Sequence, residues 1–455
     1  MFIVWTLWWP MLYITLLFSA RAWCGFLCPL SLVNQYGNKL RKGKTINFVK
    51  WEFIAYILFF LVIIFEQVSG MFLSTQITLI VFIFLFLLAF IMGLLFQRHS
   101  FCNIVCPIGA ILGIFSRLSF IGVRVKKKIC RTCRDKPCLG GGKVEPCPLY
   151  NYIPELDTNQ NCLLCTNCIK NCPYDSANLQ FVSPTEELTR SVKFKLAESL
   201  FIIALLAFTT TLTTAGTKFY RILNLGLTGN LLRVSDLVIA ILLFFIIYYI
   251  ITFISSKING KQFKDNLKDD GYVYLPLTFA ILSYTIIIGF LNPWLNVNQS
   301  LLSIIKYSVI LLGGLWSLDV LHERAKKYIE MLPHAILIIG IALLWLFMLI
   351  PQAPDGMGED IYQVVSGEII KMDAFSMGFS PSTLMAKKGD KIILEIINKD
   401  ITHAFDIDVF NIHEILKPGE VKMVEFVADT KGVFQFYCQV PGHSEAGMNG
   451  KLMIT

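Results

Sequence analysis

Eight cysteines in the middle of the chain fall into two short runs, and thiolates at such spacing bind metals. The second run reads C-x2-C-x2-C-x3-C-P and the first a looser C-x2-C-x4-C-x8-C-P. Three closely spaced cysteines can hold one [4Fe–4S] cluster, and the cysteine before the proline then ligates the neighbouring cluster. We therefore predict two such clusters. The predicted ligands are Cys130, Cys133, Cys138 and Cys172 for cluster 1, and Cys162, Cys165, Cys168 and Cys147 for cluster 2.

Zinc sites and disulfides are the alternatives for these eight cysteines. Zinc sites usually pair two C-x2-C knuckles across a longer gap and rarely use a tight run of four. Iron–sulfur clusters fit the spacing better, most clearly in the second run.

A second group of metal-ligand types lies near the C-terminus. Cys438, His443 and Met448 follow the spacing C-x4-H-x4-M, and His403 stands earlier, beside a predicted strand. Two imidazoles, one thiolate and a weak thioether are the ligand set of a blue-copper electron-transfer centre. A binuclear copper site would need a second cysteine where the chain has Gly442. We predict a mononuclear copper; the alternative is a metal-free domain with an incidental histidine.

Two further cysteine pairs follow C-x3-C-P, each after an apolar stretch and an arginine. They are Cys24 with Cys28 and Cys102 with Cys106, and they form an internal repeat. On one helix each pair would share a face, and the proline would end or kink that helix. If the repeats pack together, four thiols converge and could bind a further metal or act as redox thiols. The alternative is that they are ordinary core cysteines.

The other histidines carry weaker signals. His413 stands beside Glu414 without a partner at ligand spacing, so we predict a surface residue. His99, His322 and His334 lie at the ends of apolar stretches, and none lies inside one. We therefore expect no membrane haem, because a haem between spans needs axial ligands within them.

Composition points to a membrane protein. Of the 455 residues 55% are hydrophobic and 16% charged, which is too apolar for one soluble domain. The net charge of +8 does not indicate nucleic-acid binding, because the basic residues flank apolar stretches, as the positive-inside rule expects. We predict about eight membrane spans. They cover residues 2–20, 52–68, 76–96, 195–215, 234–255, 272–291, 303–320 and 333–350.

The loops between the spans predict the orientation. With eight spans, most basic loops and the eight-cysteine segment fall on one side, which the positive-inside rule makes cytoplasmic. Lys218, Arg221 and Arg233 fall on the other side and oppose this assignment. The cysteines support it, because all twelve clustered cysteines then lie in the reducing compartment.

The last hundred residues differ from the rest. They alternate apolar and polar residues at strand period, with turn residues between, and this predicts a β-sandwich. The fold class is therefore mixed: a polytopic α-helical membrane protein with a two-cluster insert and a C-terminal sandwich. The predicted parts are membrane helices (1–123), the cluster segment (124–192), five membrane helices (193–351), a linker (352–360) and an extracytoplasmic sandwich (361–455).

Two families resemble these parts. The sandwich with its C-x4-H-x4-M loop resembles the cupredoxins, most closely the rusticyanin type. Two C-x3-C-P motifs followed by a two-cluster segment, over about residues 1–180, resemble the NapH/NosR polyferredoxins and their relative CcoG. This resemblance implies electron transfer at the cell membrane, from quinol or towards an outer reductase. NapH-type proteins usually have a span before the first motif's helix, so the resemblance also implies that this N-terminus is short by one segment.

The chain departs from both relatives, since it lacks the flavin domain of NosR and has a cupredoxin where CcoG has an immunoglobulin-like domain. We predict a membrane electron carrier rather than a classical enzyme. It links cytoplasmic clusters with outer copper, uses redox partner proteins on both sides, and serves a respiratory reductase, for example a nitrogen-oxide reductase. The alternatives are a copper-handling assembly factor and a quinol-oxidising oxidoreductase.

Overall fold

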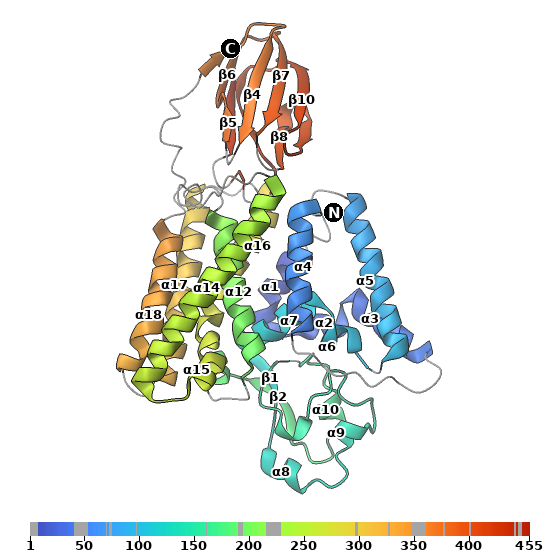
Figure 1. Cartoon of the computed structure of the whole chain (residues 1–455). Helices are drawn as coiled ribbons and strands as arrows, with labels where there is room; N and C mark the ends of the chain where they lie inside the picture. The colour runs from blue at the N-terminus through green and yellow to red at the C-terminus, as the bar shows by residue number, and fades with distance from the viewer. Residues whose placement is uncertain are drawn as a thin grey trace. The chain divides into compact units, whose positions relative to one another are not determined.

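Figure 1 shows the computed structural model of the chain. The chain forms two compact units. Unit 1 comprises residues 1–206, 244–286 and 308–339, and unit 2 comprises residues 207–243, 287–307 and 340–455. The structure describes residues 8–40, 53–69, 71, 75–96, 98–160, 162–189, 194–214, 229–295, 299–325, 328–347, 361–375, 378–399, 402–440, 443–444 and 448–455.

Most of the described chain before residue 348 is helical, apart from the eight-cysteine segment. The longer helices are α1 (Trp9–Ser19), α3 (Pro29–Leu40), α4 (Ile54–Ser69), α5 (Thr75–Leu95), α7 (Pro107–Phe115), α12 (Leu196–Thr214), α14 (Gly229–Asn259), α16 (Leu275–Leu295), α17 (Gln299–Arg324) and α18 (Tyr328–Phe347). Short helices α2 (Ala22–Phe26), α6 (Ser100–Ile104) and α15 (Phe263–Asp269) connect them.

Each predicted span coincides with a helix over its described residues, but the structure does not confirm the number of spans. Four described helices are long and apolar enough to cross a membrane. They cover residues 76–95, 237–259, 301–324 and 328–346. Four other stretches of the described helices are apolar but shorter. They cover residues 10–19, 54–66, 107–118 and 196–210.

The structure corrects the prediction for the C-x3-C-P pairs, which do not lie on one helix. Helix α2 ends at Phe26, so Cys28 lies outside it and directly precedes the first residue of α3, Pro29. Likewise α6 ends before Cys106, which caps α7 and accepts a hydrogen bond on its sulfur from the Gly109 N–H at 3.2 Å. Proline suits a first helical position because its missing N–H needs no partner there. Each proline therefore starts a helix instead of ending one.

Helix α3, which follows the first motif, packs closely against α5, which precedes the second. The carbonyl oxygen of Asn34 on α3 lies so near α5 that a Cβ at Gly93 would meet it at 2.2 Å. The Asn34 amide donates to the Ala89 carbonyl at 2.9 Å, and α7 is buried along most of its length. Small residues permit such close contact between helix backbones.

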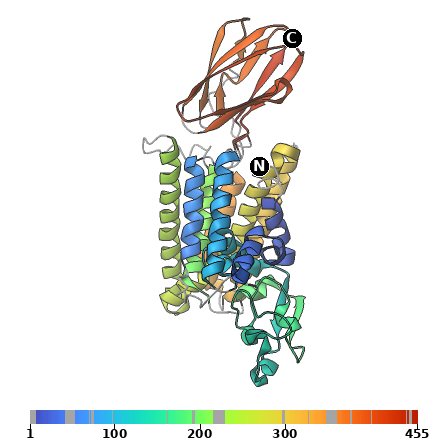
Figure 2. The same cartoon turned by 90° about the vertical axis from the view of Figure 1, so that its right-hand side faces the viewer.

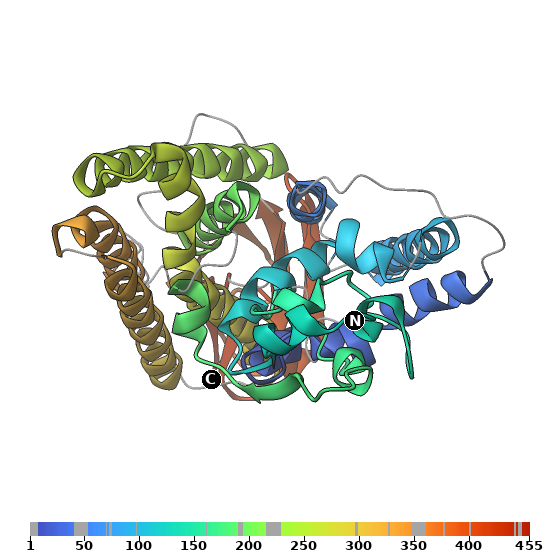
Figure 3. The same cartoon turned by 90° about the horizontal axis from the view of Figure 1, so that it is seen from below.

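The eight-cysteine segment is closed by a two-stranded antiparallel sheet. Strand β1 (Ile121–Val125) pairs with β2 (Ala177–Phe181) from Ile121↔Phe181 to Val125↔Ala177. Between these strands lie α8 (Lys127–Thr132), α9 (Pro137–Gly140) and α10 (Asn167–Lys170), and α11 (Pro184–Thr189) follows β2. Seen from below in Figure 3, this segment is drawn in teal and green.

A buried carboxylate anchors this segment. Glu187 accepts hydrogen bonds from the Thr158 hydroxyl at 2.6 Å and the Asn159 N–H at 2.7 Å, and it pairs with Arg124 at 2.6 Å. Its side chain is 1% exposed and that of Arg124 is 15% exposed. The contacts join α11 and β1 to the loop that leads to Cys162.

We expect Glu187→Ala to lower the free energy of unfolding of this segment by about 3 kcal/mol, because removing one partner of a buried ion pair leaves the other charge uncompensated. Protease cleavage within residues 124–192, followed in urea, measures the loss. The exposed neighbouring residue provides the control, since Glu186→Ala should change stability by less than about 0.5 kcal/mol. Equal cleavage of both variants would contradict the anchoring role.

Residues 361–455 form a sandwich of two sheets, as predicted (Figure 2). One sheet has the order β10-β7-β4-β5 and the other β3-β6-β12-β11-β8-β9. Their bounds are β3 (Ile361–Gln363), β4 (Ile369–Phe375), β5 (Gly378–Ser380), β6 (Thr383–Ala386), β7 (Lys391–Asn398), β8 (His403–Ile407), β9 (Ile412–Leu416), β10 (Val421–Val427), β11 (Gly432–Tyr437) and β12 (Asn449–Ile454).

Aromatic packing fills the interior of the sandwich. Phe379, Phe405 and Phe436 are buried, and their ring centroids lie 5.4 to 5.6 Å apart. Burial alternates along β7, so that every second residue faces the core. Strand β8 differs, because all five of its residues are buried. It begins with His403, so this predicted copper ligand is held by a strand packed on both faces.

Candidate metal centres

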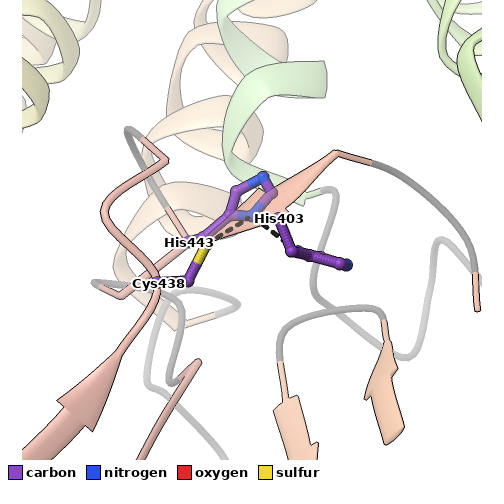
Figure 4. A group of neighbouring side chains, drawn as sticks. All are labelled: His403, Cys438 and His443. Carbon is purple, nitrogen blue, oxygen red and sulfur yellow. Dashed lines mark hydrogen bonds between the residues drawn. The ribbon is translucent and has the colours of Figure 1, made fainter. Parts of the chain in front are cut away.

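Three of the four predicted copper ligands converge in the sandwich. The ligand atoms of His403, Cys438 and His443 all lie within 4.8 Å of one another, and all three residues are buried (Figure 4). His403 begins β8, Cys438 follows β11, and His443 stands in the loop before β12. The sandwich therefore brings together residues that lie far apart in the sequence.

The side-chain atoms that face each other are two imidazole nitrogens and one sulfur, which are common metal ligands. The Nδ1 atoms of His403 and His443 lie 3.1 Å apart, and the Cys438 sulfur lies 3.5 Å from Nδ1 of His443. The Ala404 N–H donates to the Cys438 sulfur at 3.1 Å, as expected for a thiolate that accepts a hydrogen bond. Two imidazole nitrogens and one sulfur around one point fit a copper ion.

Met448 is held close to these three residues by the backbone. It is fully buried, its N–H donates to the His443 carbonyl at 2.9 Å, and its carbonyl accepts from the Cys438 N–H at 3.1 Å. One loop thus carries the thiolate, one imidazole and the thioether. We keep Met448 as the proposed axial ligand.

A buried acid that was not predicted from the sequence lies near the proposed copper ligands. Asp406 is fully buried, accepts a hydrogen bond from the Gln439 N–H at 3.2 Å, and pairs with Nδ1 of His413 at 3.0 Å. Burial raises the pKa of Asp406 to about 6. The His413 side chain is 47% exposed, as predicted, but it has this partner. The register of the β8–β9 pair would have indicated this contact, because it places Asp406 opposite His413.

The four predicted ligands of cluster 2 line one cavity in the eight-cysteine segment. They are Cys147, Cys162, Cys165 and Cys168, together with apolar residues such as Val123 and Ile153. Burial, followed by the nearby sulfurs of the other three cysteines, raises the pKa of the Cys168 thiol to about 12. The cavity walls are almost entirely apolar apart from the sulfurs, which suits an inorganic cluster held by thiolates.

The four predicted ligands of cluster 1 are also neighbours. Burial raises the pKa of the Cys138 thiol, and the sulfurs of Cys130, Cys133 and Cys172 raise it further. Ser176 joins two of them, since its hydroxyl lies 3.1 Å from the Cys130 sulfur and its N–H donates to the Cys172 sulfur at 3.2 Å. The fourth cysteine of the second run therefore lies with the first run, as the crossed pairing predicts.

The two C-x3-C-P motifs meet, as the repeat suggested. Cys24, Cys28, Cys102 and Cys106 line one cavity together with Arg21. Arg21 is buried, and its guanidinium lies against the start of α7, where a Cβ at Gly109 would meet it at 3.1 Å. The cavity therefore contains four sulfurs and one buried cation.

This four-cysteine cavity adjoins the cavity of the predicted cluster 2 ligands. A Cβ at Gly25, between Cys24 and Cys28, would meet the Leu163 carbonyl oxygen at 3.1 Å. Leu163 lies between Cys162 and Cys165 and lines the cluster 2 cavity. From the second repeat, Arg98 donates to the Cys147 carbonyl at 3.0 Å. Both motifs thus contact the loops that hold cluster 2, and neither contact was apparent from the sequence.

Comparisons with known proteins agree with this two-part organisation. Residues 338–454 match the family model described as a cupredoxin-like domain. Residues 1–46 and 78–128 match the model described as a 4Fe-4S binding domain. The second match covers both C-x3-C-P motifs and ends before Cys130.

Each of the relatives matches only part of the chain. Ferredoxin-type protein NapH of Haemophilus influenzae is 28% identical over 174 residues, 34% of this chain and 60% of NapH. An uncharacterized protein of Methanocaldococcus jannaschii is 29% identical over 164 residues, 34% of this chain and 62% of that protein. Nitrous-oxide reductase of Cupriavidus necator is 38% identical over 73 residues, 15% of this chain and 11% of the reductase. The alignments thus span less than two thirds of each relative.

The chain therefore joins a NapH-like iron–sulfur part to a cupredoxin-like domain at its C-terminus. Its apolar helices and its NapH homology make it a membrane protein.

Proposed function

We propose that this chain is a membrane electron-transfer protein that links iron–sulfur clusters on the cytoplasmic side with a mononuclear copper on the outer side. The observation that carries the proposal is the convergence of separate ligand sets in one chain: His403, Cys438 and His443 in the sandwich, and two sets of four cysteines before it. When bound, the clusters and the copper each take up and release single electrons.

The proposed sidedness rests on charge and cysteine distribution. Basic loops such as that with Lys257, Lys261, Lys264 and Lys268 fall on the side of the eight-cysteine segment when eight spans are counted. Only Cys438 follows residue 173, so the proposed outer domain can form no internal disulfide. Its single thiol is then available for copper.

The C-x3-C-P cysteines are the proposed link from cluster 2 into the membrane part. Their sulfurs line a cavity that adjoins the Cys162–Cys165 loop. We propose that these four thiolates bind a third iron–sulfur cluster. Arg21 would offset the negative charge of the thiolates, which is costly to bury without a counter-charge.

We expect Cys24→Ser combined with Cys102→Ser to remove about four iron atoms per chain, the content of one [4Fe–4S] cluster. The paramagnetic signals of clusters 1 and 2 should persist, because their ligands are unchanged. Iron analysis and paramagnetic resonance of anaerobically purified protein measure both. Unchanged iron content in the double variant would contradict an iron site at these cysteines.

Electron transfer along the chain can be tested in lipid nanodiscs. The clusters are reduced through a cytoplasmic-side donor, and the copper absorption at about 600 nm is followed. We expect this band to bleach as the cluster signals return to the oxidised state. Reduced clusters that persist beside oxidised copper for many minutes would contradict the proposal.

The respiratory role is the finer part of the proposal. We propose that a nitrogen-oxide reductase outside the membrane accepts the electrons, and that quinol can supply them. The match of the C-terminal domain to part of nitrous-oxide reductase supports a place in such chemistry. The rival function, delivery of copper to another protein, predicts that copper leaves the domain when an apo-acceptor is added. Copper retained through repeated turnover would support the carrier.

A further inference from the structure

Basic residues are concentrated in the stretch that carries three of the four predicted ligands of cluster 1, Cys130, Cys133 and Cys138. Residues 126–143 contain seven lysines and arginines but one acid, Asp135. Five of the basic residues are exposed and have no ion-pair partner among the described residues. We call these the basic face: Lys126, Lys128, Arg131, Arg134 and Lys143.

The other two basic residues of this stretch are engaged. Lys127 pairs with Asp157 at 2.6 Å, and Lys136 lies over the ring of Tyr152, with its nitrogen 5.9 Å from the ring centre. Tyr152 itself is 51% exposed. Tyrosine is enriched where proteins bind one another.

The basic face lies beside the more accessible cluster. Three of the four predicted cluster 1 ligands are partly exposed and Cys130 is buried, whereas two of the four predicted cluster 2 ligands, Cys162 and Cys168, are buried. Cys130 and Cys133 also flank Arg131 in the sequence. A partner on this face would therefore approach the ligands of cluster 1 first.

Helix α8, which carries Lys128 and Arg131 of the basic face, lies away from the membrane helices of its own unit. Helix α8 lies at the end of the eight-cysteine segment farthest from α2, α6 and α7 (Figure 1), and the view after a quarter turn agrees (Figure 2). Anionic lipid attracts basic residues only within about one Debye length, ~10 Å at 0.1 M salt. Lipid of the same bilayer is therefore a poor occupant for this face.

We propose that the basic face docks a small, acidic, one-electron carrier protein that delivers electrons to cluster 1. One electron leaves the reduced carrier and enters the cluster held by Cys130, Cys133, Cys138 and Cys172, and no atom is transferred. Opposite charges steer such encounters and raise their rate at low salt. The proposal rests on the proposed electron-transfer function and adds the surface at which electrons enter the protein.

The test uses an acidic bacterial ferredoxin, reduced photochemically, as the carrier, and the full chain in nanodiscs. Arg131→Glu with Arg134→Glu should lower the second-order rate of cluster reduction about tenfold at low salt, and the difference should vanish at high salt. Lys128→Glu with Lys143→Glu, which changes no residue next to a ligand, should give a similar loss. The conservative pair Arg131→Lys and Arg134→Lys should keep the rate.

Controls separate docking from damage to the clusters. Lys387→Glu with Lys388→Glu changes the net charge equally on an exposed turn of the cupredoxin-like domain and should leave the rate unchanged. The cationic methyl viologen radical should reduce every variant without loss of rate, and iron content should stay constant.

Two results would overturn the proposal. The first is a rate of cluster reduction by ferredoxin that depends neither on salt nor on either charge reversal, while viologen still reduces the clusters. The electron-transfer function would then stand without this docking surface. The second is tight binding of a short DNA duplex that both charge reversals abolish while the ferredoxin rate stays unchanged. That would assign the face to nucleic acid.

Discussion

Replacing Cys438 by serine should abolish the absorption at about 600 nm while leaving the iron content unchanged. The band arises from a copper–thiolate bond, and a serine hydroxyl supplies no thiolate. Cys438 is fully buried, and its sulfur lies 3.5 Å from Nδ1 of His443 and accepts from the Ala404 N–H. No other cysteine follows residue 173, so none can replace it.

Met448→Leu is the matched comparison for this prediction. An axial thioether binds copper weakly and at long range, so the variant should keep its copper and its colour but shift the reduction potential. Optical titration and copper analysis of the two variants measure the contrast. A strong band retained in Cys438→Ser would exclude Cys438 as the ligand, and complete loss of copper from Met448→Leu would show that Met448 is more than a weak ligand.

The ligand residues could be predicted because their chemistry is local. C-x4-H-x4-M places three copper ligands on one loop, and the C-x2-C-x2-C-x3-C-P run places three thiolates on one turn of chain. Only the distant ligand His403 depends on the fold, and its place beside a predicted strand made it recognisable. The strand alternation of residues 361–455 likewise predicted the sandwich correctly.

Features that depend on tertiary contacts were not predicted. Asp406 reads as one polar residue in a strand, and only the pairing of β8 with β9 brings it to His413. The contact between Gly25 and Leu163 joins parts of the chain far apart in sequence, with no residue type that marks it. The prolines after Cys28 and Cys106 were misread, because a proline signals both the end of one helix and the first turn of the next.

The crossed ligation of the two clusters predicts a distinctive pattern of iron loss. Each cluster should be lost when one of its cysteines is replaced, at about four iron atoms per chain. Cys130→Ser with Cys172→Ser should therefore lose no more iron than either single variant, because both residues belong to cluster 1. Cys168→Ser with Cys172→Ser should lose about twice as much, although these residues stand in the same run.

Ser176 supports this crossed assignment, since it contacts the sulfurs of both Cys130 and Cys172. Simple assignment by run predicts the reverse: the pair from one run would lose one cluster and the pair from different runs would lose two. Iron analysis with spin quantification of the reduced protein distinguishes the two outcomes. The experiment has two internal controls. Each double variant removes the same number of thiols, and the copper content measures the amount of folded protein.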